Sequence, residues 1–320
     1  MILVGGATRL TQSGLSMVDW KPLMGIFPPL NEKQWLDSFD AYKQYPEYQK
    51  INQFKNMNLL KYKSIYYWEY AHRILGRIIG LTFILPLVYF NKKKYLNRRL
   101  RFHMVTATCL VILQGLLGWF MVKSGLIDNP HVSHYRLAAH LFLAFILLAY
   151  TYCVRLILNN NENKEEIDKN LFFHVKILLI FYIVQVLFGA FIAGTKAGLL
   201  WNTFPLMEGQ LIPNGLFVLD PFYLNFFENM KMFQFVHRLV GTVLVVYSGW
   251  FFIKSQKQFY NKYAGLLFMT LMIQFYIGIM TLILKVPLLF GVLHQAIAAI
   301  ILLIIVHTMF LMYNSKFINR

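Results

Sequence analysis

The stretch YYWEYAHRILGR, residues 66–77, decides the fold of this chain. It opens a long apolar run, so a carboxylate, an imidazole and two guanidinium groups lie where a helix enters lipid. Ionisable groups inside a membrane span are costly and rare, which makes them candidates for function. On a helix, Glu69, His72 and Gly76 share one face, because residues three or four apart are neighbours. A carboxylate, an imidazole and a gap on one face suit a flat, metal-centred ligand.

The composition around this stretch is that of a polytopic membrane protein. Of the 320 residues, 58% are hydrophobic and only 14% are charged, and the mean hydropathy is +0.49. Soluble domains carry about 25% charged residues and lack repeated apolar runs of about 20 residues. We predict seven full spans, at roughly 69–90, 102–122, 134–158, 171–194, 232–253, 263–284 and 287–312.

Lysine and arginine gather in alternate short loops between these spans. The net charge of +17 therefore does not by itself indicate a nucleic-acid partner. By the positive-inside rule, the basic loops and the C-terminus are cytoplasmic. The loop residues are Lys92, Lys93, Lys94, Arg98, Arg99, Arg101, Lys164, Lys169, Lys254, Lys257 and Lys262.

Both cysteines, Cys109 and Cys153, fall within predicted apolar spans, and the outer loops contain none. A structural disulfide or an outer redox pair is therefore not expected. We interpret both as ordinary core residues.

The N-terminal segment and two outer segments complete the predicted topology. Residues 1–10 resemble the last part of a span, but about 20 residues are needed to cross the hydrocarbon core. They lack the basic start and cleavage site of a signal peptide, so we interpret them as an eighth, truncated first span. Residues 11–64 form a long outer loop whose aromatic and charged mixture predicts short amphipathic helices on the membrane surface. With a second outer segment, 195–230, this loop is expected to roof a site near the outer face.

An internal repeat is the strongest organisational signal. The sequence FVHRLVG (235–241) echoes YAHRILG (70–76), and QFYIG (274–278) echoes QGLLG (114–118). His140 and His294 then open the next span of each half. The chain is thus predicted to be all-α, with two tandem, pseudo-symmetric four-helix bundles. The N-terminal bundle would span 1–158 and the C-terminal bundle 159–320, as a parallel repeat.

Four histidines occupy matched places in this repeat and are our candidate ligands. Each lies a turn or two inside the outer end of its span, and each has a small residue four positions on. A porphyrin held by a histidine must lie against the neighbouring helix surface, and a small residue makes room for it. Neutral imidazoles on two facing helices can supply both axial ligands of a haem iron. The pairs of histidine and small residue are His72 and Gly76, His140 and Ala144, His237 and Gly241, and His294 and Ala298.

Other interpretations of these histidines are weaker. A single intramembrane histidine is a packed core residue about as often as a ligand, but four in repeat register are not explained that way. A zinc site needs four close ligands, or three and a water, whereas these histidines come from two bundles. A di-iron carboxylate bundle shares the Glu69-x-x-His72 element but needs further intramembrane glutamates, which the spans lack. The other five histidines are interpreted as interfacial, with only His131 or His134 placed to touch a propionate.

The two halves differ at one informative position, where Gln234 replaces Glu69 three residues before the histidine. A carboxylate near the metal in only one half indicates that chemistry happens there, while the other half holds a permanent electron-transferring haem. The alternative is that Glu69 merely pairs with an arginine, Arg73 or Arg77. The arginines near the four histidines are candidate propionate clamps, because a guanidinium binds a carboxylate bidentately, or they extend to the membrane surface. They are Arg73, Arg77, Arg136 and Arg238.

Five motifs together resemble the haem A synthase family, in the branch of bacteria and mitochondria that lacks an outer cysteine pair. The resemblance covers essentially the whole chain, and the opening motif is highly specific. The motifs are VGGATRLTQSGLSMVDWKP (4–22), PPLNEKQW (28–35), YKQYPEYQKIN (42–52), EYAHRILGR (69–77) and FVHRLVG (235–241).

The resemblance implies an eight-helix membrane enzyme that oxidises the C8 methyl of haem O to a formyl group, giving haem A for cytochrome c oxidase. It implies that His72 and His140 hold the substrate haem, that His237 and His294 ligate a haem b cofactor, and that Glu69 is catalytic. Arg73 and Arg77 would then accompany the substrate haem, and Arg238 the haem b. The implied location is the bacterial plasma membrane or the mitochondrial inner membrane, with both haem sites near the outer face. Haem O synthase is an expected contact, nucleic acid is not, and a homo-oligomer is open.

Two other functions remain as alternatives. One is a dihaem b-type electron-transfer protein or quinol-oxidising cytochrome, which haem analysis would separate from a synthase. The other is a transporter, suggested by the parallel repeat. Transporters place broken helices near the middle of the membrane, whereas the polar residues here cluster near the outer face.

Overall fold

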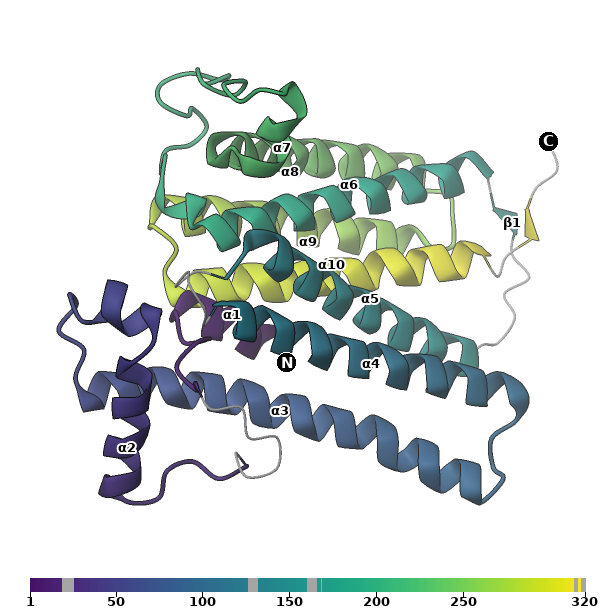
Figure 1. The fold of residues 1–320 in the computed structure, drawn as a ribbon. Helices are drawn as coiled ribbons and strands as arrows, with labels where there is room; N and C mark the ends of the chain where they lie inside the picture. The colour runs from purple at the N-terminus through teal and green to yellow at the C-terminus, as the bar shows by residue number, and fades with distance from the viewer. Residues whose placement is uncertain (19–25, 126–131, 160–165, 168, 314–315, 318–320) are drawn as a thin grey trace. The chain divides into compact units, whose positions relative to one another are not determined.

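The computed structural model describes residues 1–320 except 19–25, 126–131, 160–165, 168, 314–315 and 318–320. Helices account for almost all of its regular structure (Figure 1). The chain divides into two compact units, Met1–Leu143 and Ala144–Arg320. This division falls inside helix α5 (His134–Leu158), whereas the sequence placed the domain boundary at residue 158, the end of the same helix.

Within the described part of the chain, seven helices are long and apolar enough to cross a membrane. Each contains most of one predicted span, so the prediction of an all-α protein with seven full spans is confirmed. The first helix, α1 (Ile2–Leu10), has nine residues and is shorter than a span. The seven are α3 (Leu59–Lys92), α4 (Arg98–Gly125), α5, α6 (Lys169–Thr195), α8 (Met230–Lys254), α9 (Asn261–Ile283) and α10 (Leu288–Tyr313).

In the first unit, α3 contacts both α1 and α4. Helix α3 begins at Leu59, so the prediction of an outer loop as far as residue 64 was wrong for its last six residues. The Asn58 side chain accepts a hydrogen bond from the backbone N–H of Lys61 at 3.0 Å and caps the helix there. The extra turns carry Tyr62 and Tyr66, which are buried against the outer segment.

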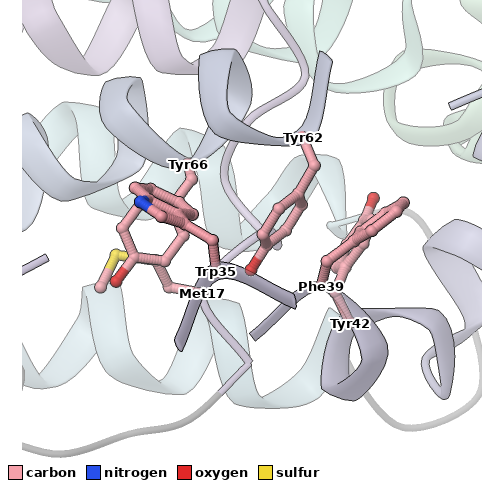
Figure 2. Packing of buried hydrophobic residues seen from close by; sticks show 6 residues of the cluster. All are labelled: Met17, Trp35, Phe39, Tyr42, Tyr62 and Tyr66. Carbon is pink, nitrogen blue, oxygen red and sulfur yellow. The ribbon is translucent and has the colours of Figure 1, made fainter. Parts of the chain in front are cut away.

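The outer segment of this unit contains the predicted short helix, α2 (Glu32–Lys43), followed by a short π-helical turn, η2 (Tyr48–Asn52). Asn31 caps α2 by accepting from the Gln34 N–H at 2.9 Å. The Trp35 ring meets the Tyr66 ring edge-on, with centroids 5.0 Å apart. Figure 2 shows six buried residues of the hydrophobic cluster that α2 and α3 form with the segment after α1: Met17, Trp35, Phe39, Tyr42, Tyr62 and Tyr66.

One tyrosine of this cluster also anchors the turn that follows α2. The Tyr42 hydroxyl donates to Glu47 Oε2 at 3.0 Å and accepts from Asn52 Nδ2 at 2.7 Å. Burial, and then the nearby Glu47 carboxylate, raise the pKa of Tyr42 above its ordinary range. The hydroxyl therefore keeps its proton and remains a donor. The outer segment is thus a packed subdomain on α3, and its contact with the membrane surface stays a prediction.

In the second unit, four long helices contact one another in a closed ring. Helix α6 contacts α8, α8 contacts α9, α9 contacts α10, and α10 contacts α6. Across the last contact, the Tyr182 hydroxyl donates to the Ala298 carbonyl at 2.8 Å. The minor elements are η3 (Ala197–Leu199), η4 (Phe222–Leu224), α7 (Asn225–Glu228) and a two-residue parallel pair, β1 (Glu166–Ile167) with β2 (Lys316–Phe317).

Candidate functional site

The four candidate histidines lie as two pairs, one in each unit. His237 on α8 and His294 on α10 have ring centroids 6.3 Å apart. Two imidazoles that bind one metal ion from opposite sides, through bonds of about 2 Å, have ring centres roughly 6 Å apart. His72 on α3 and His140 on α5 form the pair of the first unit, within range of each other's charge. The His237–His294 contact agrees with one of the two pairs that the family resemblance implied.

Matched glutamines hold the second histidine of each pair. Gln114 on α4 donates its amide to the His140 carbonyl at 3.0 Å, and Gln274 on α9 donates to the His294 carbonyl at 2.9 Å. The Gln114 amide also lies 3.3 Å from His140 Nε2. The repeat QGLLG and QFYIG thus places one amide at equivalent points beside two histidines.

Gln185 on α6 is a site residue that the sequence analysis missed. Its backbone carbonyl accepts a hydrogen bond from His237 Nδ1 at 3.0 Å. This bond fixes the tautomer, so that Nε2 carries the lone pair that can bind a metal. The Gln185 amide nitrogen lies 3.2 Å from that Nε2. A lone amide in an apolar span with a mean hydropathy of 2.5 was the signal that could have identified it.

Glu69 is buried, with 2% of its surface exposed, and its carboxylate accepts hydrogen bonds from three donors. Its Oε2 accepts from Ser16 Oγ at 2.7 Å and from the Met17 N–H at 2.8 Å. Its Oε1 accepts from Arg73 Nη2 at 2.5 Å. The same Arg73 nitrogen donates to the Met17 carbonyl at 2.9 Å. The carboxylate thus ties α3 to the segment that follows α1, and it pairs with Arg73 as the alternative interpretation stated.

Gln234 ties α8 to the segment that follows α6, but its partners have the opposite polarity. Its amide donates to the carbonyls of Ala197 and Leu200 at 3.1 and 2.7 Å. Its Oε1 accepts from Arg238 Nη2 at 2.6 Å, and that nitrogen also donates to the Trp201 carbonyl at 2.7 Å. The replacement of Glu69 by Gln234 therefore matches a change from donors to acceptors in the neighbouring segment.

The remaining candidate arginines differ in how many of their guanidinium N–H groups have hydrogen-bond partners. Arg77 Nη1 on α3 is buried without a hydrogen-bond partner, as is Arg238 Nε on α8. Arg136 on α5 lies over the Phe120 ring, 4.6 Å from its centroid. Arg77 is therefore the guanidinium near the first histidine pair that is best placed to bind an acidic ligand.

Three of the other histidines contact tyrosines. His174 Nδ1 lies 2.5 Å from the Tyr247 hydroxyl, and His307 Nδ1 lies 3.0 Å from the Tyr152 hydroxyl. His134 packs on Tyr135, with ring centroids 4.0 Å apart, and His131 lies outside the described residues. The tyrosine partners explain the polarity of His174 and His307 within apolar helices without a ligand.

The ligand set fits a haem better than the rival metals. Over the described residues, no group of three or more His, Cys, Asp or Glu side chains is placed to hold a metal ion. Both cysteines are free thiols. Nδ1 of His72, of His140 and of His294 has no hydrogen-bond partner, and neither has the amide oxygen of Gln114, Gln185 or Gln274. In each unit, paired imidazoles are a donor set that could hold the iron of a haem.

Two of the small residues predicted to make room beside the histidines contact other side chains of their own unit. A Cβ built at Gly241 would meet the Gln185 amide at 3.1 Å, and one at Gly76 would meet Met1 Cε at 3.3 Å. The role of these glycines beside a bound ligand stays a prediction.

Comparisons with known proteins show which family the chain resembles. A family model described as "COX15-CtaA: Cytochrome oxidase assembly protein" matches residues 1–306. A protein of Nitrosospira multiformis named "Heme A synthase" is 46% identical over 305 residues, which cover 92% of this chain and 85% of that protein. The protein of the same name from Nitrosomonas eutropha is 45% identical, and the match covers 94% of this chain and 86% of that protein. That of Flavobacterium psychrophilum is 44% identical, covering 97% and 93%.

Proposed function

The chain belongs to the COX15-CtaA family of cytochrome oxidase assembly proteins, and on that premise we propose that it is a haem A synthase, a membrane oxidoreductase that converts haem O to haem A. The observation that carries the proposal is its similarity, over more than nine tenths of its length, to relatives of that name. The two histidine pairs agree with it, because the reaction needs a site for the substrate haem and a site for a redox cofactor.

The first unit is the proposed substrate site and the second the haem b site. In the second unit the His237 and His294 rings lie 6.3 Å apart, and the Gln185 carbonyl holds one of them in the ligating tautomer. Such a supported ligand suits a permanently bound group. In the first unit, the buried carboxylate of Glu69 precedes His72 by one turn. This carboxylate suits a haem that enters, reacts and leaves.

Two tandem bundles, 1–158 and 159–320, remain our proposal for the architecture, with α1 as the shortened eighth helix. In each unit an arginine on the histidine helix bonds both a side chain one turn earlier and a backbone carbonyl of the preceding segment. These contacts join Arg73 to Glu69 and to Met17, and Arg238 to Gln234 and to Trp201. Matched contacts on matched helices support a common ancestral geometry for the two bundles.

The proposed chemistry is two successive hydroxylations of the C8 methyl, followed by loss of water from the gem-diol to give the formyl group. With water as the oxygen source, each hydroxylation releases two protons and two electrons. Glu69 is proposed to accept a proton from the methyl or from the attacking water, since a buried carboxylate can serve as a general base. For this it must exchange one of its three donors for the substrate, and Ser16 is the neutral one with a rotatable hydroxyl.

The other residues of the chain bind and orient. His72 and His140 would hold the substrate iron, and Arg73 and Arg77 would lie beside its propionates. His237 and His294 would hold haem b, with Arg238 beside it. Haem b supplies one-electron transfer when bound, which carries the released electrons singly towards an acceptor.

The proposed location is the plasma membrane of a bacterium, with the mitochondrial inner membrane as the alternative. The seven apolar helices require a membrane, and the basic loops predict that the C-terminus is cytoplasmic. Haem O synthase is the proposed donor of substrate, because haem O is poorly soluble in water.

The test is to extract haems from the purified protein after co-expression with a source of haem O, and to identify them by chromatography with mass detection. Haem b together with haem O, a hydroxylated haem or haem A supports the synthase. Two haem b per chain and no other haem would instead favour the dihaem electron-transfer protein, which the paired histidines also fit. A protein without haem would contradict both.

A further inference from the structure

Each of the four candidate haem ligands packs its imidazole against a glycine of a neighbouring helix. A Cβ built at Gly5 on α1 would lie 2.9 Å from His72 Cε1, and one at Gly118 on α4 would lie 3.0 Å from His140 Cε1. In the second unit, a Cβ at Gly189 on α6 would lie 3.0 Å from His237 Cε1. One at Gly278 on α9 would lie 2.9 Å from His294 Cε1.

These contacts are specific for the ring edge that lies between its two nitrogens. At all four sites the nearest atom is Cε1, and Nδ1 follows at 3.4 to 3.7 Å. A side chain at the glycine would therefore press on the Cε1–Nδ1 edge of the ring, which is the edge away from the metal-binding Nε2. The imidazole would have to rotate, and its Nε2 would turn away from its present direction.

We propose that Gly5, Gly118, Gly189 and Gly278 are positioning residues that set the rotation of the four axial imidazoles. The inference rests on the proposed function, because it takes the histidines as haem ligands. Helix interfaces in membranes use small residues to let backbones approach closely. Here the space beside the glycine holds a ligand ring, so the glycine acts on the haem through the histidine.

Hydrogen bonds alone do not fix these rings. Among the described residues, His72, His140 and His294 have no hydrogen-bond partner at Nδ1, the atom through which a ligating histidine is ordinarily oriented. Steric contact with a glycine therefore replaces the missing hydrogen bond at those three histidines. At His237 the contact adds to the bond from Nδ1 to the Gln185 carbonyl. We accordingly expect His294 to be more sensitive to its glycine than His237 is.

The test compares two alanine substitutions on the same helix, α9. Gly278→Ala places a methyl 2.9 Å from His294 Cε1, and Gly265→Ala places one 2.9 Å from Phe252 Cε2. The crowding is equal, but only the first presses on a ligand. We expect Gly278→Ala to retain haem b about 10- to 100-fold less tightly, the usual effect of disturbing a ligand's support. The haem that remains should show a shifted low-spin EPR signal, because that signal depends on the orientation of the ligand planes.

Gly265→Ala should keep the haem b content and the EPR signal of the unchanged protein. An unaltered spectrum and haem content in Gly278→Ala would overturn the proposal, and so would equal losses in both variants, which would show a general packing effect. If Gly278→Ala yields no folded protein, Gly118→Ala serves instead, with haem b in the second unit reporting the fold. Its control is Gly115→Ala on the same helix, where an added Cβ meets nothing within 4 Å.

For that second pair the measurement is retention of added haem O. Gly118→Ala should release haem O faster than Gly115→Ala, with haem b unchanged in both, and equal release would overturn the inference. Failure of the proposed function is distinguishable, because an unaltered protein that binds no haem would contradict the function before any glycine is changed.

Discussion

Replacing Glu69 by glutamine should damage the first unit in two separable ways. The carboxylate accepts three hydrogen bonds, from Ser16 Oγ, the Met17 N–H and Arg73 Nη2. A glutamine has one acceptor oxygen, so its amide nitrogen must face either Arg73 or the Ser16–Met17 pair. The substitution removes one charge-assisted hydrogen bond and makes the amide N–H face another hydrogen-bond donor. Together these changes cost about 3 kcal/mol, which is roughly a 150-fold change in the equilibrium constant for attachment of the segment. Arg73 keeps its bond to the Met17 carbonyl, which limits the loss.

The structural part of this loss can be measured at the Met17 amide. Its N–H donates to Glu69, so hydrogen exchange of a peptide containing Met17 reports whether the segment stays attached. Ser16→Ala is the matched control, because it removes one of the three donors at a cost of about 1 kcal/mol and leaves the carboxylate in place. Faster exchange is expected in both variants, with the larger effect in Glu69→Gln. Unchanged Met17 exchange in Glu69→Gln would refute the anchoring geometry.

The catalytic part is measured as haem A formed per protein and per minute. A general base contributes about 10²- to 10⁴-fold, so Glu69→Gln should lose at least 100-fold. Ser16→Ala should stay within a few-fold of the unchanged protein. If Glu69→Gln still formed haem A at the rate of Ser16→Ala, the carboxylate would be an anchor and the assignment of a base would be rejected.

Three further substitutions test the charge and packing of the two units. Gln234→Glu should destabilise the second unit by about 3 kcal/mol, because a carboxylate would face the carbonyls of Ala197 and Leu200; a thermal unfolding curve equal to that of the unchanged protein would contradict this. Arg77→Gln should weaken retention of haem O about 10-fold and leave haem b untouched, since its buried Nη1 has no other partner; equal effects on both haems would disprove the assignment. Trp35→Ala should lower the free energy of unfolding by about 3 to 5 kcal/mol, because it removes the ring at the centre of the cluster. Limited proteolysis within residues 26–58 should then be faster. Leu36→Ala, on the exposed face of α2, is the control and should not change the rate.

The sequence predicted the elements and the residues of the site because both rest on periodic, local signals. Apolar runs predicted seven spans, and the repeat of YAHRILG as FVHRLVG placed His72 and His237 at equivalent positions of the two units. The outer end of α3 was not predicted, because the cap at Asn58 is a single polar residue and Tyr62 gains its burial from α2, which is distant in sequence. Tertiary packing, which no local pattern encodes, extends that helix.

The hydrogen-bond polarity of the site was also beyond the sequence. From the sequence, Gln234 at the position equivalent to Glu69 was interpreted as the loss of an ionisable group. The structure shows that each side chain forms hydrogen bonds with the backbone groups that face it. Met17 presents an N–H to Glu69, and Ala197 and Leu200 present carbonyls to Gln234. Which backbone group faces a side chain depends on the path of a loop. Gln185 was missed for the same reason, because its carbonyl reaches His237 only when α6 and α8 are packed.

The charges on α3 and α8 predict that binding of haem O and its oxidation can be separated by a substitution at Glu69. Helix α3 carries Glu69, Arg73 and Arg77, and the equivalent turns of α8 carry Gln234, Arg238 and Thr242, so each set sums to one positive charge. The extra guanidinium of Arg77 therefore offsets the extra carboxylate in the formal charge of the two helices. Glu69→Gln raises the first sum to two positive charges, while the base is removed. We therefore expect this variant to hold haem O at least as tightly as the unchanged protein while failing to oxidise it. Purified Glu69→Gln should contain haem O beside haem b, and a variant that contained haem b alone would show that Glu69 serves binding instead.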